Sequence, residues 1–401
     1  MQVMIARGME KALLASARTY PVLTVTGPRQ SGKTTLVRKV FPKYDYVSLE
    51  NPDDRTFALE DPRGFLNRFP DAVILDEVQR APELLSYLQG RVDEDDRPGR
   101  YVLTGSQNFL LLEKVSQSLA GRTALFQLLP FSRAELAGRK PMALDGIGHK
   151  IPRGRPAADE LFDMLFKGFY PRIHDKGLKP QDWLRNYYQT YIERDVRSIV
   201  QVGDIEAFGR FVRLCAGRTG QILNLSSMGS DCGISHATAR RWLSVLEASF
   251  IVYLLRPHYE NFSKRLIKSP KLYFIDTGLL CYLLRIRSAD ELVTHALRGG
   301  VFETFVLVEL LKASLNQAAD PEVHFWRDTG GHEVDFVSGH GRALVPIEAK
   351  SGETIASDYL KGITYWRSLP GQEKAPAAVV YGGEASMMRS GTAFYSWENW
   401  L

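Results

Sequence analysis

Residues 21–35 read PVLTVTGPRQSGKTT, in which a short apolar run leads directly into a glycine-rich loop that ends in Lys33 and Thr34. This is the pattern GxxxxGK[ST], and it stands where a P-loop requires it, between a predicted buried strand and a predicted helix. The glycines allow backbone N–H groups to surround phosphate oxygens, and the following helix presents its positive N-terminal dipole to them. We therefore expect ATP to bind here, with Lys33 at its β- and γ-phosphates and Thr34 as a ligand of Mg²⁺.

A second apolar run, residues 72–75, ends in the acidic pair Asp76 and Glu77. The carboxyl end of a strand is where a parallel sheet presents its ligand site. We expect Asp76 to hold Mg²⁺ and Glu77 to orient or deprotonate the attacking water. An acidic pair after a strand is often only a solvated turn, but the upstream phosphate loop supports the catalytic interpretation. The predicted nucleotide-binding residues are Gly27, Gly32, Lys33, Thr34, Thr35 and Asp76.

Two further polar positions complete the expected catalytic set. The apolar run Tyr101–Thr104 precedes Ser106 and Gln107, and a polar side chain there can sense the γ-phosphate, with Ser106 preferred over Gln107. Arg122 lies in the segment Ala-Gly-Arg and is a candidate arginine finger for a neighbouring subunit if the protein forms a ring. The alternative is that Arg122 is an ordinary surface arginine.

The chain is predicted to contain three structured regions. Apolar runs at 22–26, 46–49, 72–75 and 101–104 alternate with amphipathic segments, which predicts a mainly parallel sheet with helices on its faces. A stretch rich in Gly, Pro, Arg and Lys then predicts a linker or exposed loop. Helical periodicity follows, and a mixed pattern returns near residue 299. The predicted boundaries are 1–137, 138–159 for the linker, 160–298 and 299–401.

The composition is that of a globular protein, since 44% of the 401 residues are hydrophobic and 24% are charged. No apolar run approaches the ~20 residues that span a bilayer, and the N-terminus lacks the apolar segment of a signal peptide. We therefore expect a cytoplasmic protein with no membrane partner. Three cysteines without a CxxC pair favour reduced thiols over disulfides or a zinc site. The net charge of +5 permits contact with nucleic acid without establishing it.

The ordered segments GPRQSGKTT, LDEVQRAP, LTGSQ and SLAGR resemble the AAA+ ATPases whose AAA domain is followed by a domain of unknown function, DUF4143. Downstream segments YIERDVRSI, KRLIKSPKLYFIDTGLL, EVDFV and PIEAKSG are also similar to that family, so the resemblance covers nearly the whole chain. Membership implies an ATPase that assembles into a ring.

The middle region carries the pattern of a winged helix, with two short helices around a glycine turn and then two strands joined by a basic loop. Side chains on the open face of the second helix can enter a DNA groove while the loop, or wing, contacts phosphates. Winged helices also serve as protein–protein modules, so both kinds of partner stay open. The predicted DNA-binding residues are Arg240, Arg241, Lys264, Arg265 and Lys268, and Lys271 is placed on the same wing.

Three consecutive strands are predicted in the C-terminal region, at 323–327, 332–338 and 343–350. Because side chains alternate along a strand, Asp335 on the second strand can converge with Glu348 and Lys350 on the third. Two carboxylates can hold Mg²⁺ or Mn²⁺, and a lysine can position or activate water for attack on a phosphodiester.

This arrangement resembles the PD-(D/E)xK nuclease superfamily, although Val334 replaces the usual proline before the aspartate. Glu303, on the predicted helix 301–312, matches the additional helix-borne acid of many members. The resemblance therefore implies a second metal ion held by Glu303, Asp335 and Glu348, with Lys350 as a catalytic residue. The alternative is a nuclease fold retained as an inactive binding module.

The expected fold class is α/β, with a P-loop AAA+ parallel-sheet domain, a helical and winged-helix middle domain, and a small restriction-endonuclease-like C-terminal domain. We expect a homo-oligomeric ring, a hexamer or a multiple, that moves or remodels DNA. Duplex or branched DNA is the expected substrate, with Holliday junctions preferred by analogy with branch-migration motors. A regulatory switch that binds a protein partner is the main alternative, and an ATPase coupled to a toxin or defence system is a third.

Overall fold

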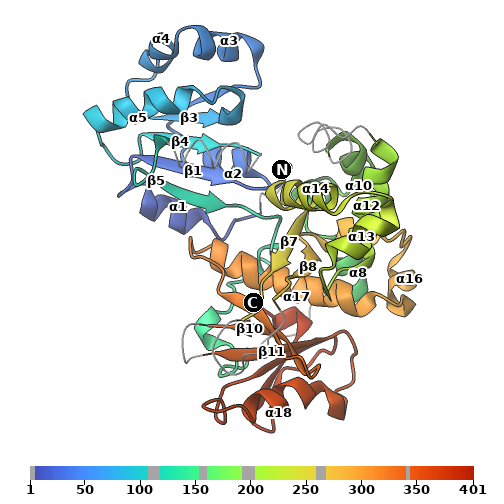
Figure 1. Cartoon of the computed structure of the whole chain (residues 1–401). Coiled ribbons are helices and arrows are strands. Elements are labelled where there is room, and N and C mark those ends of the chain that lie inside the picture. The colour runs from blue at the N-terminus through green and yellow to red at the C-terminus, as the bar shows by residue number, and fades with distance from the viewer. Residues whose placement is uncertain (1–4, 107–117, 153–159, 192–203, 259–267, 340–343) are drawn as a thin grey trace. The chain divides into compact units, whose positions relative to one another are not determined.

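The computed structural model of the chain (Figure 1) describes residues 5–106, 118–152, 160–191, 204–258, 268–339 and 344–401. The chain divides into two compact units. The first consists of Met1–Phe131, Ala248–Phe250 and Leu315–Asp320, and the second of Ser132–Glu247, Ile251–Ser314 and Pro321–Leu401. The winged-helix and C-terminal regions, which the sequence presents as separate domains, therefore share one unit.

A five-stranded parallel sheet forms the centre of the first unit, in the order β2-β3-β4-β1-β5. Its strands are β1 (Val22–Thr26), β2 (Asp45–Ser48), β3 (Val73–Asp76), β4 (Tyr101–Thr104) and β5 (Thr123–Gln127). The first four confirm the predicted apolar runs to within a residue or two, whereas β5 is not predicted from the sequence. Because all strands run the same way, the segments that follow β1, β3 and β4 meet at one edge of the sheet.

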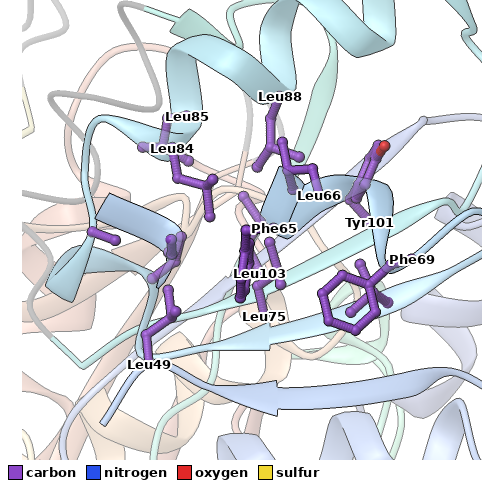
Figure 2. Close-up of a cluster of buried hydrophobic side chains, with 14 of the residues drawn as sticks. Leu49, Phe65, Leu66, Phe69, Leu75, Leu84, Leu85, Leu88, Tyr101 and Leu103 are labelled. Atoms are coloured by element: carbon purple, nitrogen blue, oxygen red, sulfur yellow. The ribbon is translucent and has the colours of Figure 1, made fainter. Parts of the chain in front are cut away.

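Helices cover both faces of this sheet. They are α1 (Glu10–Ser16) and α2 (Lys33–Val40) on one face, and α3 (Pro52–Glu60), α4 (Pro62–Asn67) and α5 (Leu84–Glu94) on the other. Side chains alternate along a strand, so Leu75 and Leu103 point into one core while their neighbours point into the opposite core. Figure 2 shows the first of these cores, where Phe65 of α4 lies against the two strand leucines and Leu85 of α5 belongs to the same cluster.

The second unit contains a group of helices, some of which are joined by a buried carboxylate. They are α7 (Arg133–Leu136), the 3-10 helix η2 (Leu144–Gly146), α8 (Leu161–Lys167), α9 (Pro171–Lys176), α10 (Pro180–Tyr187), α15 (Thr277–Leu283) and α16 (Ala289–Thr294). Asp276 caps α15 by accepting from the backbone N–H of Leu279 at 2.8 Å, and it also accepts from the N–H of Phe169 at 2.7 Å. One buried side chain thus joins α15 to the turn between α8 and α9.

The predicted winged helix is present in the same unit. Its elements are α12 (Ile205–Gly217), β6 (Gln221–Ile222), α13 (Leu225–Cys232), α14 (His236–Ala248), β7 (Val252–Leu255) and β8 (Lys271–Phe274). The strands form an antiparallel sheet in the order β6-β8-β7. Trp242 of α14 packs edge-on against Phe208 of α12 with ring centroids 5.3 Å apart, so the buried face of α14 is the predicted one.

The C-terminal part of the second unit is a six-stranded mixed sheet in the order β13-β14-β12-β11-β10-β9. Its elements are α17 (Arg298–Leu315), β9 (Val323–Arg327), β10 (Glu333–Ser338), β11 (Val345–Lys350), η4 (Ser357–Leu360), α18 (Lys361–Arg367), β12 (Ala378–Tyr381), β13 (Met387–Arg389), β14 (Thr392–Ser396) and η5 (Trp397–Asn399). The three predicted strands and the predicted helix are confirmed, and the meander β9-β10-β11 is antiparallel as expected.

The predicted linker is anchored where the structure describes it, at residues 138–152. Gly146, Ile147 and Gly148 are buried. The backbone N–H of Gly148 donates to the Tyr395 hydroxyl at 2.8 Å, and that hydroxyl donates to the carbonyl of Lys150 at 2.9 Å. Residues 146–148 therefore pack against β14, whereas most of the other described residues of this segment are exposed.

Candidate functional site

The P-loop connects β1 to α2 and has the conformation that its glycines permit. Gly27 has a φ of 139°, and a Cβ there would lie 2.2 Å from the carbonyl oxygen of Leu128. Gly32 has a φ of 93° and directly precedes α2. Side chains rarely adopt such angles, so glycine is needed at both positions for the loop to turn back onto the helix N-terminus.

Lys33 is the buried cation of this loop. Its Nζ donates to the carbonyl oxygens of Gly27 at 3.0 Å and Pro28 at 2.8 Å. Burial lowers the pKa of Lys33 to about 8, and the nearby carboxylates of Glu77 and Asp76 oppose this effect. Phosphate oxygens entering the loop would interact strongly with this ammonium, because little water surrounds it.

Asp76 collects three hydroxyl groups at the end of β3. The Thr34 hydroxyl donates to Oδ2 at 3.0 Å, the Tyr46 hydroxyl donates to the same oxygen at 2.8 Å, and Thr104 donates to Oδ1. Burial and the bond to Asp76 raise the pKa of Tyr46 to about 12, so it stays a donor. A hydroxyl and a carboxylate in contact are the oxygen ligands that Mg²⁺ prefers, so Thr34 and Asp76 fit the predicted ion.

Glu77 adopts a backbone conformation that is rare for glutamate, with a φ of 56°. Its Oε2 accepts a hydrogen bond from the Ser106 hydroxyl at 3.1 Å and another from Nε2 of Gln79, in the 3-10 helix η1 (Val78–Arg80). Residues held in such conformations cluster at functional sites. The structure thus brings the predicted base and the preferred γ-phosphate sensor together, while Gln107 lies outside the described residues.

A groove of about 530 Å³ opens beside Thr34 and Thr35. Its wall includes Arg38, whose guanidinium lies 4.6 Å from the centre of the Tyr46 ring. The groove thus places a cation and an aromatic ring next to the residues that fit Mg²⁺.

Arg7 also belongs to this site, although its role is not predicted from the sequence. Its guanidinium donates to the carbonyl oxygen of Ser31 in the P-loop at 2.7 Å and to that of Leu129 at 2.6 Å. It also lies 4.9 Å from the centre of the Phe131 ring. Arg7 therefore links the P-loop to the segment after β5. Local sequence patterns cannot predict these contacts, because the partners are distant along the chain.

Arg122 lies at the opposite edge of the sheet from the P-loop. Its carbonyl accepts from the backbone N–H of Val22, at the start of β1. Its guanidinium pairs with Asp93 through two hydrogen bonds of 2.5 and 3.1 Å. Arg122 does not join the ATP site of the same chain, and its role as a finger toward a second copy stays a prediction.

The C-terminal sheet brings three of the predicted residues into contact. Nζ of Lys350 lies 3.2 Å from Oδ2 of Asp335 and 2.6 Å from Oε2 of Glu348. Burial and the neighbouring Asp335 raise the pKa of Glu348 well above its usual range. The two carboxylates on adjacent strands could hold a single Mg²⁺ or Mn²⁺ ion, and the lysine between them could position water.

Glu303 does not complete this set. Its Oε1 accepts from Nζ of Lys271 at 3.2 Å and from the hydroxyl of Tyr273. Within the described ranges, no three His, Cys, Asp or Glu side chains lie where they could hold a metal ion together. The three-carboxylate ligand set implied by the resemblance is therefore not formed, because an internal lysine already faces Glu303.

The winged helix exposes part of its predicted basic surface. Arg240 and Arg241 on α14 and Lys268 before β8 are exposed, whereas Lys264 and Arg265 lie outside the described residues. The placement of Lys271 on the wing surface is wrong, since that side chain is only 2% exposed and forms ion pairs.

The sheet order, the P-loop and the acidic pair define the first unit as a P-loop ATPase. Residues 19–137 match the AAA domain family AAA_14, residues 158–290 match the domain of unknown function DUF8612, and residues 298–400 match the domain of unknown function DUF4143. An uncharacterized protein of Mycobacterium tuberculosis and one of Mycobacterium bovis are each 32% identical over 370 residues, which is 91% of this chain and 77% of theirs. The chain belongs to this family of AAA-like P-loop ATPases.

Several solved structures resemble the chain distantly. A Walker-type ATPase of Pyrococcus abyssi is 14% identical and is matched over 71% of this chain and 96% of its own length, with a TM-score of 0.44. A RuvB protein of Thermotoga maritima is 18% identical over 62% of this chain and 88% of its own length, with a TM-score of 0.28.

No helix among the residues that the structure describes is long and apolar enough to cross a membrane.

Proposed function

We propose that this ATPase acts on DNA, which it binds through the winged helix. The observation that carries the proposal is the exposed pair Arg240 and Arg241 on α14, the second helix of a helix-turn-helix, with Lys268 exposed at the base of the wing. A helix in this position can enter the major groove, and arginine binds both base edges and phosphates. A basic surface of this kind could also bind an acidic protein. The test below therefore distinguishes DNA from a protein partner.

The ATPase site supplies the driving reaction. The amides of the P-loop and Lys33 bind the phosphates, Thr34 and Asp76 hold Mg²⁺, and Glu77 deprotonates or orients the water. Mg²⁺, when bound, offsets charge on the phosphates. We propose that turnover in a ring of subunits moves or remodels DNA, with branched DNA such as Holliday junctions as the preferred substrate.

Charge reversal on α14 tests DNA binding. Arg240→Glu/Arg241→Glu should weaken binding at least tenfold and lower the slope of log affinity against log salt by about two, one for each lost phosphate contact. The control is Arg285→Glu/Arg287→Glu, which makes the same charge change at exposed positions outside the winged helix. If the α14 variant binds every DNA like the wild type, a regulatory switch with a protein partner becomes the leading account.

Metal-dependent DNA cleavage is a second candidate, favoured by the contact of Lys350 with both Asp335 and Glu348. In such a reaction a water oxygen bonds to phosphorus, the phosphodiester P–O bond breaks, and a proton reaches the leaving oxygen. Lys350 would position the water, and the carboxylates would hold one Mg²⁺ or Mn²⁺ ion that offsets negative charge on the phosphate.

A labelled panel of single-stranded, duplex, forked and four-way-junction DNA tests this candidate. Wild type is compared with Glu348→Gln and with Lys33→Ala in Mg²⁺ or Mn²⁺, and ATP turnover is followed in the same samples. Cleavage lost only in Glu348→Gln would support a nuclease. No cleavage, with turnover stimulated by one DNA form, would leave a DNA motor with an inactive nuclease fold.

A further inference from the structure

A second cationic centre lies beside the Asp335–Glu348–Lys350 trio, and it comes from the winged helix. Lys271, the first residue of β8, is 2% exposed. Its Nζ lies 3.2 Å from Oε1 of Glu303 on α17 and 2.5 Å from Oε1 of Glu333 on β10. One ammonium thus joins three elements that are remote in sequence.

The surroundings of Lys271 keep it charged. Burial favours the neutral amine, but the carboxylates of Glu303, Glu333 and Asp335 hold the pKa of Lys271 above its usual range. Tyr273, two residues further along β8, donates its hydroxyl to Glu303, and Arg327 donates to the other oxygen of Glu333 at 2.9 Å. These partly buried carboxylates therefore have cationic or hydroxyl partners from within the chain, as charges removed from water require.

This arrangement disagrees with the metal site that the nuclease resemblance implies. There, the helix-borne acid is expected to face the same metal ion as the strand carboxylates. Here the cation that faces Glu303 is Lys271, and among the described side chains no three acids form a ligand group.

We infer that Lys271 stands in the place of a metal ion at Glu303 and, by pairing with Glu303 and Glu333, locks the winged-helix strand β8 onto α17 and β10. The lock goes beyond the proposed function, because it holds whether or not the protein binds or cuts DNA. In this interpretation Lys271 holds elements of the protein together, although the basic sequence around it suggests a contact with DNA. These ion pairs thereby attach the winged helix to the sheet that carries Asp335, Glu348 and Lys350.

A charge cycle in the full-length chain tests the lock. Lys271→Met leaves Glu303 and Glu333 facing each other without the ammonium and should lower the melting temperature by on the order of 10 °C in EDTA. Lys271→Met/Glu303→Gln removes both charges, leaves Arg327 on Glu333, and should recover most of that loss. Lys374→Met, at an exposed position of the same unit, is the matched control and should melt like the wild type. If Lys271→Met does not fold, the double variant is still expected to fold. A double variant that is no more stable than Lys271→Met overturns the lock.

Metal and DNA add two independent readouts. Millimolar Mg²⁺ or Mn²⁺ should raise the melting temperature of Lys271→Met by more than it raises that of the wild type, and adding Glu303→Gln should abolish this excess. A Lys271→Met variant whose melting temperature rises no more than that of the wild type would contradict the substitution of a metal by lysine.

The double variant should bind DNA with the wild-type slope of log affinity against log salt. A stable double variant whose slope falls by about one would make Lys271 a DNA contact instead. Should the wild type bind no DNA, the proposed function fails while the thermal cycle still decides on the lock.

Discussion

At the scale of single residues, Glu77 shows how the fold holds a catalytic group in place. A φ of 56° costs glutamate about 1 kcal/mol or more. The Ser106 hydroxyl and the Gln79 amide hold its carboxylate at the end of β3. The side chain is therefore aimed by its backbone and fixed by two donors, which suits a base that must act on water beside a bound phosphate.

Replacing Glu77 tests this role. Glu77→Gln keeps the size of the side chain and removes the base, so ATP should still bind while turnover falls by a factor on the order of 10²–10⁴. Steady-state turnover and nucleotide binding measured on the same preparation separate the two effects. Glu60→Gln, an exposed change at the end of α3, is the control and should leave both unchanged. Unchanged turnover in Glu77→Gln would remove Glu77 from the catalytic set.

Arg7 gives a second prediction at this scale. Arg7→Ala removes two hydrogen bonds from a charged group to the carbonyls of Ser31 and Leu129, each worth roughly 1.5–3 kcal/mol. Because one partner is in the P-loop, ATP affinity should fall by tenfold or more, with a smaller change in the turnover of bound ATP. Arg18→Ala, at an exposed position after α1, is the matched control. A variant that loses stability but keeps its ATP affinity would limit Arg7 to a structural role.

At the scale of elements, the sequence predicts what local patterns encode. The four apolar runs of the parallel sheet, the winged-helix helices and the meander β9-β10-β11 are all found, because burial on one or both faces leaves a periodic pattern. The strand β5 escapes prediction because it lies at an edge of the sheet, where Leu125 is 48% exposed and the alternation is weak.

The candidate sites also contain a part that the sequence predicts and a part that it does not. The P-loop residues, Asp76, Glu77 and Ser106 are brought together as predicted, because each follows a strand whose direction the pattern fixes. The partner of Glu303 could not be predicted, since Lys271 sits in a basic stretch that is typical of a surface loop. Its burial depends on tertiary contacts with α17 and β10, and these leave no periodic signal in the sequence.

The close approach of the P-loop to β5 leads to an element-scale prediction. In Gly27→Ala the new Cβ would meet the Leu128 carbonyl at 2.2 Å, and a backbone atom cannot move aside cheaply. We expect a loss of at least about 2 kcal/mol in the free energy of unfolding of the first unit. Gly90→Ala, in a turn of α5 with nothing within 4 Å, should instead stabilise by up to ~1 kcal/mol. Urea denaturation measures both, and equal effects would contradict the steric argument.

At the scale of the whole molecule, the position of Arg122 bears on whether a second copy of the chain completes the ATP site. Within the chain, Arg122 lies at the end of the sheet away from the P-loop and pairs with Asp93. A surface ion pair of this kind contributes little to stability, so by itself it gives little reason for an arginine at this position. A finger that acts on a neighbouring nucleotide would be a stronger reason.

Matched removal of the two partners separates these roles. If Arg122 serves only the ion pair, Arg122→Ala and Asp93→Asn should have the same small effect on stability and none on turnover. If it reaches a neighbouring γ-phosphate, Arg122→Ala should lower turnover on the order of 10³-fold while Asp93→Asn leaves turnover near wild type.

Mixing two variants then tests for a ring. The Arg122→Ala subunits have an intact P-loop, and the Lys33→Ala subunits still supply the arginine. A mixture of the two inactive proteins should recover turnover as subunits exchange, since some interfaces then combine a working loop with a working finger. A mixture that stays inactive, although exchange is shown by labelled subunits, would contradict a finger in trans.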